Sequence, residues 1–236
     1  MKKGIDCTTR ITKTLADNLK AQGIAFICRY LVPASMAWKR LTKAEADVIT
    51  AAGINILSVF ESSANRASAG KTAGLTDGMA AMKEAQIVGQ PVGTTIYFAV
   101  DYDAQPKDYD MIEAYLKAAY SQITGYNIGV YGSYAVCEAM HLRGIKYCWQ
   151  TYAWSKGKKS AYANVYQYKN GASVAGITCD LNESYGNEGY WSLDLTYENA
   201  VKVIAEKTGI SPEYWISRKN IDPNFAAFIK KIAKAM

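Results

Sequence analysis

Acidic side chains stand at the ends of several short apolar runs in this sequence. Asp101 and Asp103 close the run IYFAV, and the other three acids end runs elsewhere in the chain. The full set is Asp6, Glu61, Asp101, Asp103 and Asp180. Acids scattered over a surface would fall on helices and loops as often as at strand ends. Clustered carboxylates repel one another, so we expect one of them to have a raised pKa.

A neutral carboxylic acid beside an ionised one is the pair that cleavage of a glycosidic bond requires. One group protonates the leaving oxygen, and the other stabilises or attacks the sugar cation. Two alternatives remain open: an acid cluster that binds Mg²⁺ or Ca²⁺, or polar caps that only terminate the strands. The single histidine, His141, has no second ligand at metal spacing, so neither a zinc site nor another cofactor is expected.

The elements that must position these acids alternate along the chain. Eight short runs rich in β-branched and aromatic residues predict strands at Gly4–Asp6, Ile24–Tyr30, Ile54–Phe60, Thr95–Val100, Ile128–Tyr131, Tyr147–Gln150, Val165–Tyr168 and Ile177–Asp180. Helical patterns cover 11–21, 42–53, 74–88, 107–124 and 133–143, and little helix follows the last strands. The alternation predicts the α/β class with parallel strands and right-handed crossovers.

Eight strands favour closure into a (β/α)8 TIM-like barrel with short or missing late helices. An open doubly wound sheet is the alternative, but no GxGxxG follows the first strand. Barrel strands end at the active-site face, so the acids are expected to converge there. Alternation along a strand places Asp101 and Asp103 on one side, about 6.6 Å apart. It also turns Cys7 and Cys179 toward the helix layer.

Five cysteines without a CxxC pair favour buried reduced thiols over a disulfide framework. Aromatic and polar residues near the same strand ends are candidates for holding a sugar, because Tyr and Trp combine a flat apolar face with a polar group. The candidate substrate-binding residues are Arg29, Tyr30, Trp149, Gln150, Tyr152, Tyr166, Gln167 and Asn182.

The pattern changes near residue 190, which divides the chain into a predicted barrel, 1–190, and a small helical module, 191–236. Residues 196–236 hold seven Lys or Arg and four Asp or Glu, half of the chain's net charge of +6. The module either binds a partner or packs on the barrel, and the basic excess either suits an anionic partner or serves solubility. No apolar run follows the first lysines as in a signal peptide, and none is long enough to span a membrane.

Five segments carry a family resemblance: GIDCTT, FICRYL, SVFES, IYFAVDYDA and CDLN. Over residues 3–190 the chain resembles the glycoside-hydrolase-like barrel family, formerly a domain of unknown function. That family is related to glycoside hydrolase family 25, the muramidases that cut peptidoglycan. The muramidases pair Asp-x-Glu on strand four with Asp on strands one and eight, positions that match Asp6, Asp101, Asp103 and Asp180.

The resemblance implies a peptidoglycan glycosidase with Asp103, where the muramidases have Glu, as the general acid. Asp101 or Asp6 would stabilise the sugar cation, Asp180 would position the pair, and Glu61 could supply reach that Asp103 lacks. The C-terminal helices resemble a module of phage and clostridial wall-lytic enzymes, which implies a prophage-type endolysin whose module binds wall or another protein. Such an enzyme is made in the cytoplasm and reaches the wall through a holin or by lysis; nucleic acid is not an expected partner. The alternatives are a non-catalytic barrel that binds wall glycan and a metal-dependent hydrolase.

Overall fold

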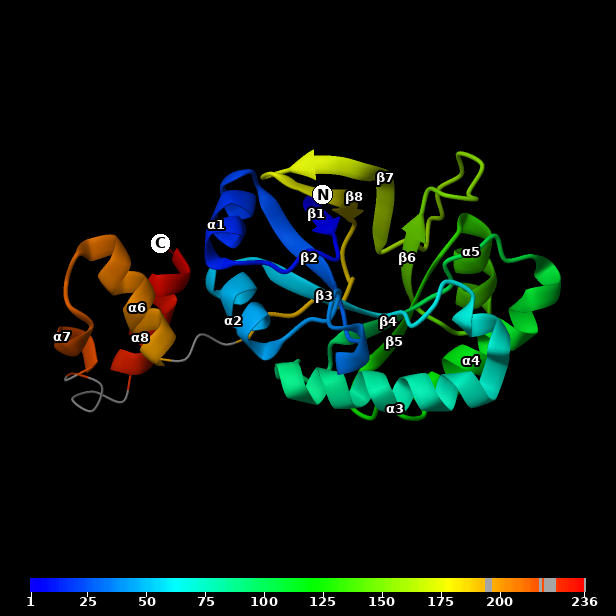
Figure 1. Ribbon diagram of the computed structural model, residues 1–236, viewed down its shortest axis with the longest axis horizontal. Helices are drawn as coiled ribbons and strands as arrows, with labels where there is room; N and C mark the ends of the chain where they lie inside the picture. The colour runs from blue at the N-terminus through cyan, green and yellow to red at the C-terminus, as the bar shows by residue number, and fades with distance from the viewer. Residues whose placement is uncertain (194–196, 217, 219–223, 236) are drawn as a thin grey trace.

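The predicted barrel is present in the computed structural model, which describes residues 1–193, 197–216, 218 and 224–235. Eight strands pair in chain order and close on themselves (Figure 1). They are β1 (Lys2–Asp6), β2 (Ile24–Tyr30), β3 (Asn55–Phe60), β4 (Thr95–Ala99), β5 (Asn127–Gly132), β6 (Tyr147–Thr151), β7 (Val165–Val174) and β8 (Ile177–Ser184). The α/β barrel expected from the alternating pattern is therefore confirmed.

Helices follow the first five strands, and the described chain has none after β6 or β7, as expected. They are α1 (Lys13–Ala21), α2 (Lys43–Ala51), α3 (Gly70–Val88), α4 (Tyr109–Tyr120) and α5 (Tyr134–Leu142), with short 3₁₀ turns η1 (Ala34–Met36), η2 (Arg66–Ala69) and η3 (Pro106–Asp108). The Thr42 hydroxyl accepts a hydrogen bond from the Glu45 backbone N–H and so caps α2. The Glu45 carboxylate serves a different purpose, a buried ion pair described below.

The last strand departs from the expected all-parallel sheet. β8 runs antiparallel to both β7 and β1. Only Ala175 and Gly176 separate β7 from β8, and both have positive φ, 49° and 84°. Two residues make a tight hairpin, whereas a parallel connection needs about a dozen residues or more. The hairpin lies along the top of the molecule in Figure 1, on the side where the late helices are missing.

Two apolar layers hold the barrel. The inner layer fills the barrel and contains Phe26, Cys28, Leu57, Val59, Tyr97, Ala99, Trp149 and Val165. The outer layer lies between strands and helices, and it includes Cys7 and Cys179, as strand alternation predicts. The barrel rim is thereby built from residues that continue the inward-facing rows.

The cysteines correct one expectation. Cys137 on α5 and Cys148 on β6 form a disulfide, with Cα atoms 5.8 Å apart. Cys148 faces out of the barrel toward α5, so the β–α packing brings the two sulfurs together. Cys7, Cys28 and Cys179 are free and buried, as expected for inert thiols. The expectation of five reduced thiols was therefore wrong for one pair.

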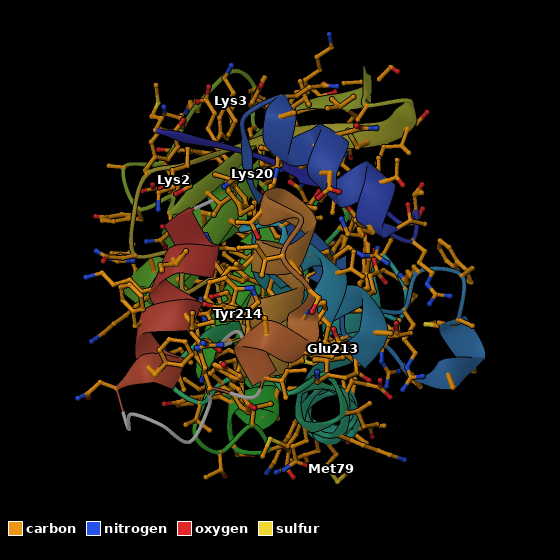
Figure 2. The ribbon with its side chains drawn as sticks, turned by 90° about the vertical axis from the view of Figure 1, so that its left-hand side faces the viewer. Lys2, Lys3, Lys20, Met79, Glu213 and Tyr214 are labelled. Carbon is orange, nitrogen blue, oxygen red and sulfur yellow. A yellow bond between two sulfur atoms is a disulfide. The ribbon has the colours of Figure 1, made fainter. Side chains whose placement is uncertain are left out.

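The C-terminal segment forms three helices, α6 (Tyr197–Thr208), α7 (Pro212–Ile216) and α8 (Phe225–Ala235). They share an apolar cluster of their own, built on Tyr197, Ala200, Val201, Ile204, Ile229 and Ala233. Figure 2 views the molecule from their side and labels Glu213 and Tyr214 of α7. The backbone of Trp191 pairs with Ile56 of β3, so contacts with the barrel continue past the boundary expected near residue 190. No helix in the described part of the chain is long and apolar enough to cross a membrane.

Candidate active site at the barrel mouth

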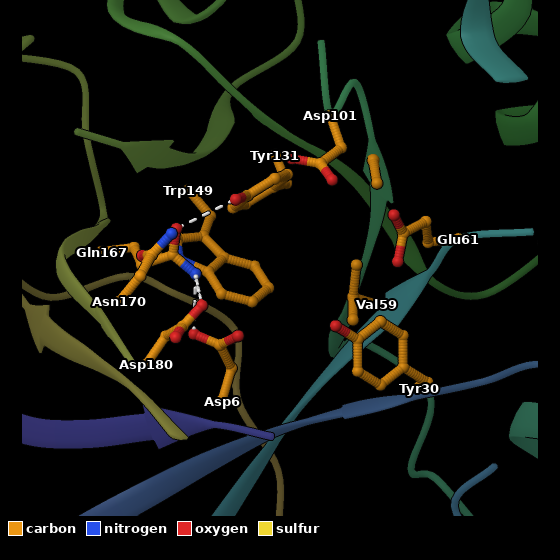
Figure 3. A pocket seen from close by; sticks show the side chains of 11 residues that line it. Asp6, Tyr30, Val59, Glu61, Asp101, Tyr131, Trp149, Gln167, Asn170 and Asp180 are labelled. Carbon is orange, nitrogen blue, oxygen red and sulfur yellow. Dashed lines mark hydrogen bonds between the residues drawn. The ribbon is translucent and has the colours of Figure 1, made fainter. Parts of the chain in front are cut away.

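A pocket of about 140 Å³ opens at the end of the barrel where β1 to β6 finish. It is lined by Asp6, Tyr30, Val59, Glu61, Ala99, Asp101, Tyr131, Trp149, Gln167, Asn170 and Asp180. Figure 3 shows two acids on each side: Asp6 and Asp180 next to Gln167, and Asp101 and Glu61 opposite them. The pocket thus gathers four carboxyl groups from distant parts of the chain.

The first pair of acids is joined by amide side chains. Asp6 and Asp180 are directly paired residues of β1 and β8. Gln167 Nε2 donates to Oδ2 of Asp6 at 2.9 Å and to Oδ2 of Asp180 at 3.3 Å. Asn182 Nδ2 donates to the same Asp6 oxygen at 2.7 Å. The backbone N–H of Gly171 holds Oδ1 of Asp180 at 2.8 Å.

The orientation of both amides is fixed by donors on their oxygens. Gln167 Oε1 accepts from the Tyr131 hydroxyl at 2.9 Å and from Thr151 Oγ1 at 2.8 Å. Asn182 Oδ1 accepts from Trp149 Nε1 at 2.8 Å. A donor on the amide oxygen forces the NH₂ group to point the other way. Both NH₂ groups are therefore aimed at the acids.

Burial makes Asp6 the most perturbed acid of the pocket. Its side chain is 7% exposed. Desolvation raises the pKa of Asp6 to about 7, against the opposing hydrogen bonds from Asn182 and Gln167 and with a further contribution from the charges of Asp180 and Asp101. Burial also raises the pKa of Asp180, which the Gly171 N–H partly offsets. Asp6 therefore keeps its proton to a higher pH than an ordinary aspartate does.

The opposite side contains a cation. Lys39 Nζ lies 3.0 Å from Glu61 Oε2, and both side chains are largely buried. Burial and the Glu61 charge raise the pKa of Asp101, while the Lys39 ammonium lowers it. The two sides therefore differ in the charge beside their acids. Neutral amide groups donate hydrogen bonds to Asp6 and Asp180, whereas a lysine cation lies beside Glu61 and lowers the pKa of Asp101.

Asp103 does not join this cluster. It is exposed and does not line the pocket, although Asp101 two residues earlier does. β4 ends at Ala99, so Asp101 and Asp103 lie in the loop beyond it, where the alternation of a strand no longer applies. The expected placement of both aspartates on one face is therefore corrected.

Five of the eight predicted substrate-binding residues also lie outside the pocket lining, although one of them, Asn182, contacts the pocket residue Asp6. Arg29 is buried on the outer side of β2, where Nε and Nη2 bind the Glu45 carboxylate and Nη1 binds the Cys7 carbonyl. Gln150 holds the loop after β6 through Lys158 O and Ser160 N. Tyr152 is exposed, and Tyr166 lies beside Lys159. Arg29, Gln150 and Tyr166 are each one position from an inward residue, so alternation turns them away.

The remaining predicted residues lie at or against the pocket. Asp6, Tyr30, Glu61, Asp101, Trp149, Gln167 and Asp180 line it, and Asn182 touches Asp6 from β8. Sequence reasoning missed Tyr131, Asn170 and Lys39. Tyr131 had a usable signal, because it ends the fifth predicted strand as Tyr30 ends the second. Lys39 had none, since it reaches Glu61 from a loop.

A closed eight-stranded α/β barrel with an acid-lined mouth defines the class as a glycoside-hydrolase-like barrel. The chain belongs to the family described as Rv2525c-like, glycoside hydrolase-like domain, whose sequence profile matches residues 17–197. This confirms the resemblance seen in the sequence. Within the described residues, no three His, Cys, Asp or Glu side chains are arranged to hold a metal ion.

Two curated proteins of Bacillus subtilis strain 168 are similar in sequence, both named as uncharacterized. FadG is 31% identical over 62% of this chain and 27% of its own length. YbfG is 27% identical over 92% of this chain and 30% of its own length. The chain therefore spans less than a third of the length of these relatives.

Solved structures show the same fold at low sequence identity. The Tat-secreted protein Rv2525c of Mycobacterium tuberculosis, crystallised with L-tartrate, has a TM-score of 0.73 and 22% identity over 81% of this chain and 99% of its own. The catalytic domain of endolysin ply40 from a Listeria monocytogenes bacteriophage has a TM-score of 0.54 and 15% identity. The match covers 80% of this chain and 95% of the ply40 domain. The autolysin LytC of Streptococcus pneumoniae, in complex with a synthetic peptidoglycan ligand, has a TM-score of 0.53 and 12% identity. The match covers 77% of this chain and 46% of LytC.

Proposed function

We propose that this chain is a glycosidase that cleaves the glycan strands of peptidoglycan in the manner of a muramidase. The observation that carries the proposal is the pocket itself. Asp6, whose pKa is raised to about 7, faces Asp101 and Glu61 across it. An acid that keeps its proton opposite a carboxylate is the combination that glycosidic cleavage uses.

In this proposal Asp6, and not Asp103, is the general acid. Asp6 Oδ2 accepts two N–H groups, from Asn182 and Gln167, so the proton is carried by Oδ1. Oδ1 donates that proton to the leaving oxygen as the bond from the sugar carbon to this oxygen breaks. Water then adds to the sugar carbon, and its released proton restores Asp6.

Asp101 has the role of the stabilising carboxylate. The breaking bond leaves positive charge on the sugar ring, and an anion fixed across the pocket stabilises that charge. Lys39 favours the ionised form of Asp101 because it lowers the pKa of this group. Asp180 and Gln167 position Asp6, which the shared hydrogen bonds support.

Peptidoglycan as the substrate is supported by the structural neighbours. LytC was crystallised with a synthetic peptidoglycan ligand, and ply40 is an endolysin, although both share only the fold with this chain. If peptidoglycan is the substrate, the enzyme acts at the cell wall, and we propose that a holin or lysis releases it there. Fractionation of producing cells before and after lysis tests this localisation.

The first experiment measures turbidity loss of purified walls and, by mass spectrometry, the new reducing ends. We expect Asp6→Asn to lower the rate by at least about a hundredfold, the usual contribution of general acid catalysis. Asp103→Asn is the matched control, and it should stay within about threefold of wild type because it lies outside the pocket. A reversed result for these variants returns the acid role to Asp103. Loss of activity on adding EDTA would favour a metal-dependent hydrolase instead.

A glycan-binding barrel without hydrolysis is the second candidate. The exposed position of Asp103, where the muramidases carry their catalytic Glu, favours it. This candidate predicts that the protein sediments with purified walls and produces no new reducing ends.

We further propose that helices α6–α8 contact the wall or a protein partner. Their apolar cluster is separate from those of the barrel, and Phe228 and Ile216 remain exposed on them. The double variant Phe228→Ser/Ile216→Ser in the full chain should reduce sedimentation with walls if these helices bind them. An unchanged sedimentation would mean that these helices do not bind the wall and that wall binding belongs to the barrel alone.

A further inference from the structure

The acid pocket is smaller than the polymer that it is proposed to cut. Its volume of about 140 Å³ is below the roughly 300–1,000 Å³ of sites that enclose a whole small ligand. Neighbouring saccharide units of a glycan strand must therefore lie on the surface outside the pocket. The side chains around the mouth decide where that surface is.

Trp38 is the most exposed aromatic side chain in the described ranges, at 68%. It lies in the loop between β2 and α2, which leaves the barrel at the pocket residue Tyr30. Isolated exposed apolar residues are common in proteins and need no explanation by themselves. Trp38 differs because its ring contacts a lysine that also contacts two pocket residues.

Lys39 makes that connection. Its Nζ lies 5.3 Å from the centre of the Trp38 ring and 4.6 Å from the centre of the Tyr30 ring. The same nitrogen is 3.0 Å from Oε2 of Glu61, a pocket residue. One ammonium group thus holds an exposed indole beside the Tyr30 and Glu61 edge of the pocket. Lys39 approaches one face of the indole, and Trp38 is still 68% exposed, so the rest of the ring surface is accessible to a ligand.

We propose that Trp38 forms a second sugar subsite, adjoining the pocket on its Tyr30 and Glu61 side. The open face of the indole stacks on the pyranose ring of the saccharide unit next to the one in the pocket. A flat apolar ring with a polar N–H suits a sugar, which has apolar C–H faces and polar edges. The inference rests on the proposed function for the class of its ligand.

The chain-length dependence of binding tests this subsite. N-acetylglucosamine and its hexasaccharide are titrated into the full chain in an Asp6→Asn background, so that the ligand is not consumed. The single sugar occupies only the pocket, whereas the hexasaccharide also reaches the adjoining subsite. We expect Trp38→Ala to weaken hexasaccharide binding about tenfold, which corresponds to about 1.4 kcal/mol, and to leave binding of the single sugar within about twofold. Trp38→Phe should retain most of the affinity, because it keeps a stacking face.

Tyr120→Ala is the matched control, since Tyr120 is also exposed, at 52%, but lies at the end of α4 outside the pocket lining. It should change binding of neither sugar, and circular dichroism checks that each variant is folded. If the parent binds the hexasaccharide and Trp38→Ala binds it equally well, the subsite is wrong while the proposed function stands. If the parent binds neither sugar nor purified peptidoglycan, the proposed function fails and the subsite fails with it.

Discussion

Asp6 and Asp180 share one hydrogen-bond donor, Gln167 Nε2, at 2.9 and 3.3 Å. The Tyr131 and Thr151 hydroxyls donate to Gln167 Oε1, which turns the NH₂ group of the same amide toward the two carboxyl groups. The two carboxyl groups are therefore kept close together at the barrel mouth, where their mutual repulsion and their burial favour a retained proton. This arrangement makes the protonation of Asp6 the property on which the following predictions depend.

Activity should fall as the pH rises through about 7, the raised pKa of Asp6, because the general acid is then ionised. Gln167→Leu removes a donor that favours the charged form, so the pKa of Asp6 should rise further. The basic limb of kcat/KM against pH is expected to move upward by about one unit, since a hydrogen bond to a charged group contributes about 1.5–3 kcal/mol and one unit corresponds to about 1.4 kcal/mol. A basic limb that does not move would separate Gln167 from the acid.

Asp6→Asn should stabilise the fold more at high pH than at low pH. The folded pKa, about 7, is above the ordinary value of 3.8, so the folded state binds the extra proton and the stability that Asp6 contributes is lost as pH rises through 7. Asn resembles the protonated acid and has no such loss. The gain at pH 8 relative to pH 4 should approach, but not exceed, about 4 kcal/mol. Urea unfolding at both values measures it, and Asp103→Asn should show no comparable change.

Lys39→Met should raise the pKa of Asp101, because the cation that lowers it is removed. The acid limb of the activity profile is then expected to move to higher pH, and ¹³C NMR of labelled aspartate follows the same shift without any substrate. Arg40→Met is the control: Arg40 pairs with Glu84 at 2.7 Å and contacts no pocket acid. Equal shifts in both variants would mean that the loop and not the Lys39 charge is responsible. Lys39→Arg should restore most of the wild-type titration.

Arg29→Met should lower the free energy of unfolding by about 3–5 kcal/mol, since it leaves the buried Glu45 carboxylate without its cation. Arg29 does not line the pocket, so kcat should remain near the wild-type value at temperatures where the variant is folded. The double variant Arg29→Met/Glu45→Leu should recover much of the loss, because no buried charge is left unpaired. Chemical denaturation measures all three stabilities. A large fall in kcat with unchanged stability would place Arg29 in the site after all.

Much of the fold was predictable because its signals are local. The strand runs and the lack of late helices depend on residues a few positions apart, and the structure has both. The direction of β8 also has a local cause, the two-residue turn at Ala175 and Gly176. The alternation of strands and helices nevertheless predicted a parallel strand there. Asp180 nevertheless reaches the mouth, because β8 enters the barrel from that end and pairs Asp180 with Asp6.

The barrel, the family and a set of acids at strand ends are predictable from sequence alone, because periodicity and motif are properties of neighbouring residues. Which acid keeps its proton depends on the folded surroundings of each one. Asp6 is buried by contacts with Gln167 and Asn182, which lie 161 and 176 residues away along the chain. Desolvation depends on everything packed around a group, so no local pattern could rank Asp6 above Asp103. For the same reason the role of Lys39 could not be predicted, because its charge acts on the pocket only where the fold places it beside Glu61.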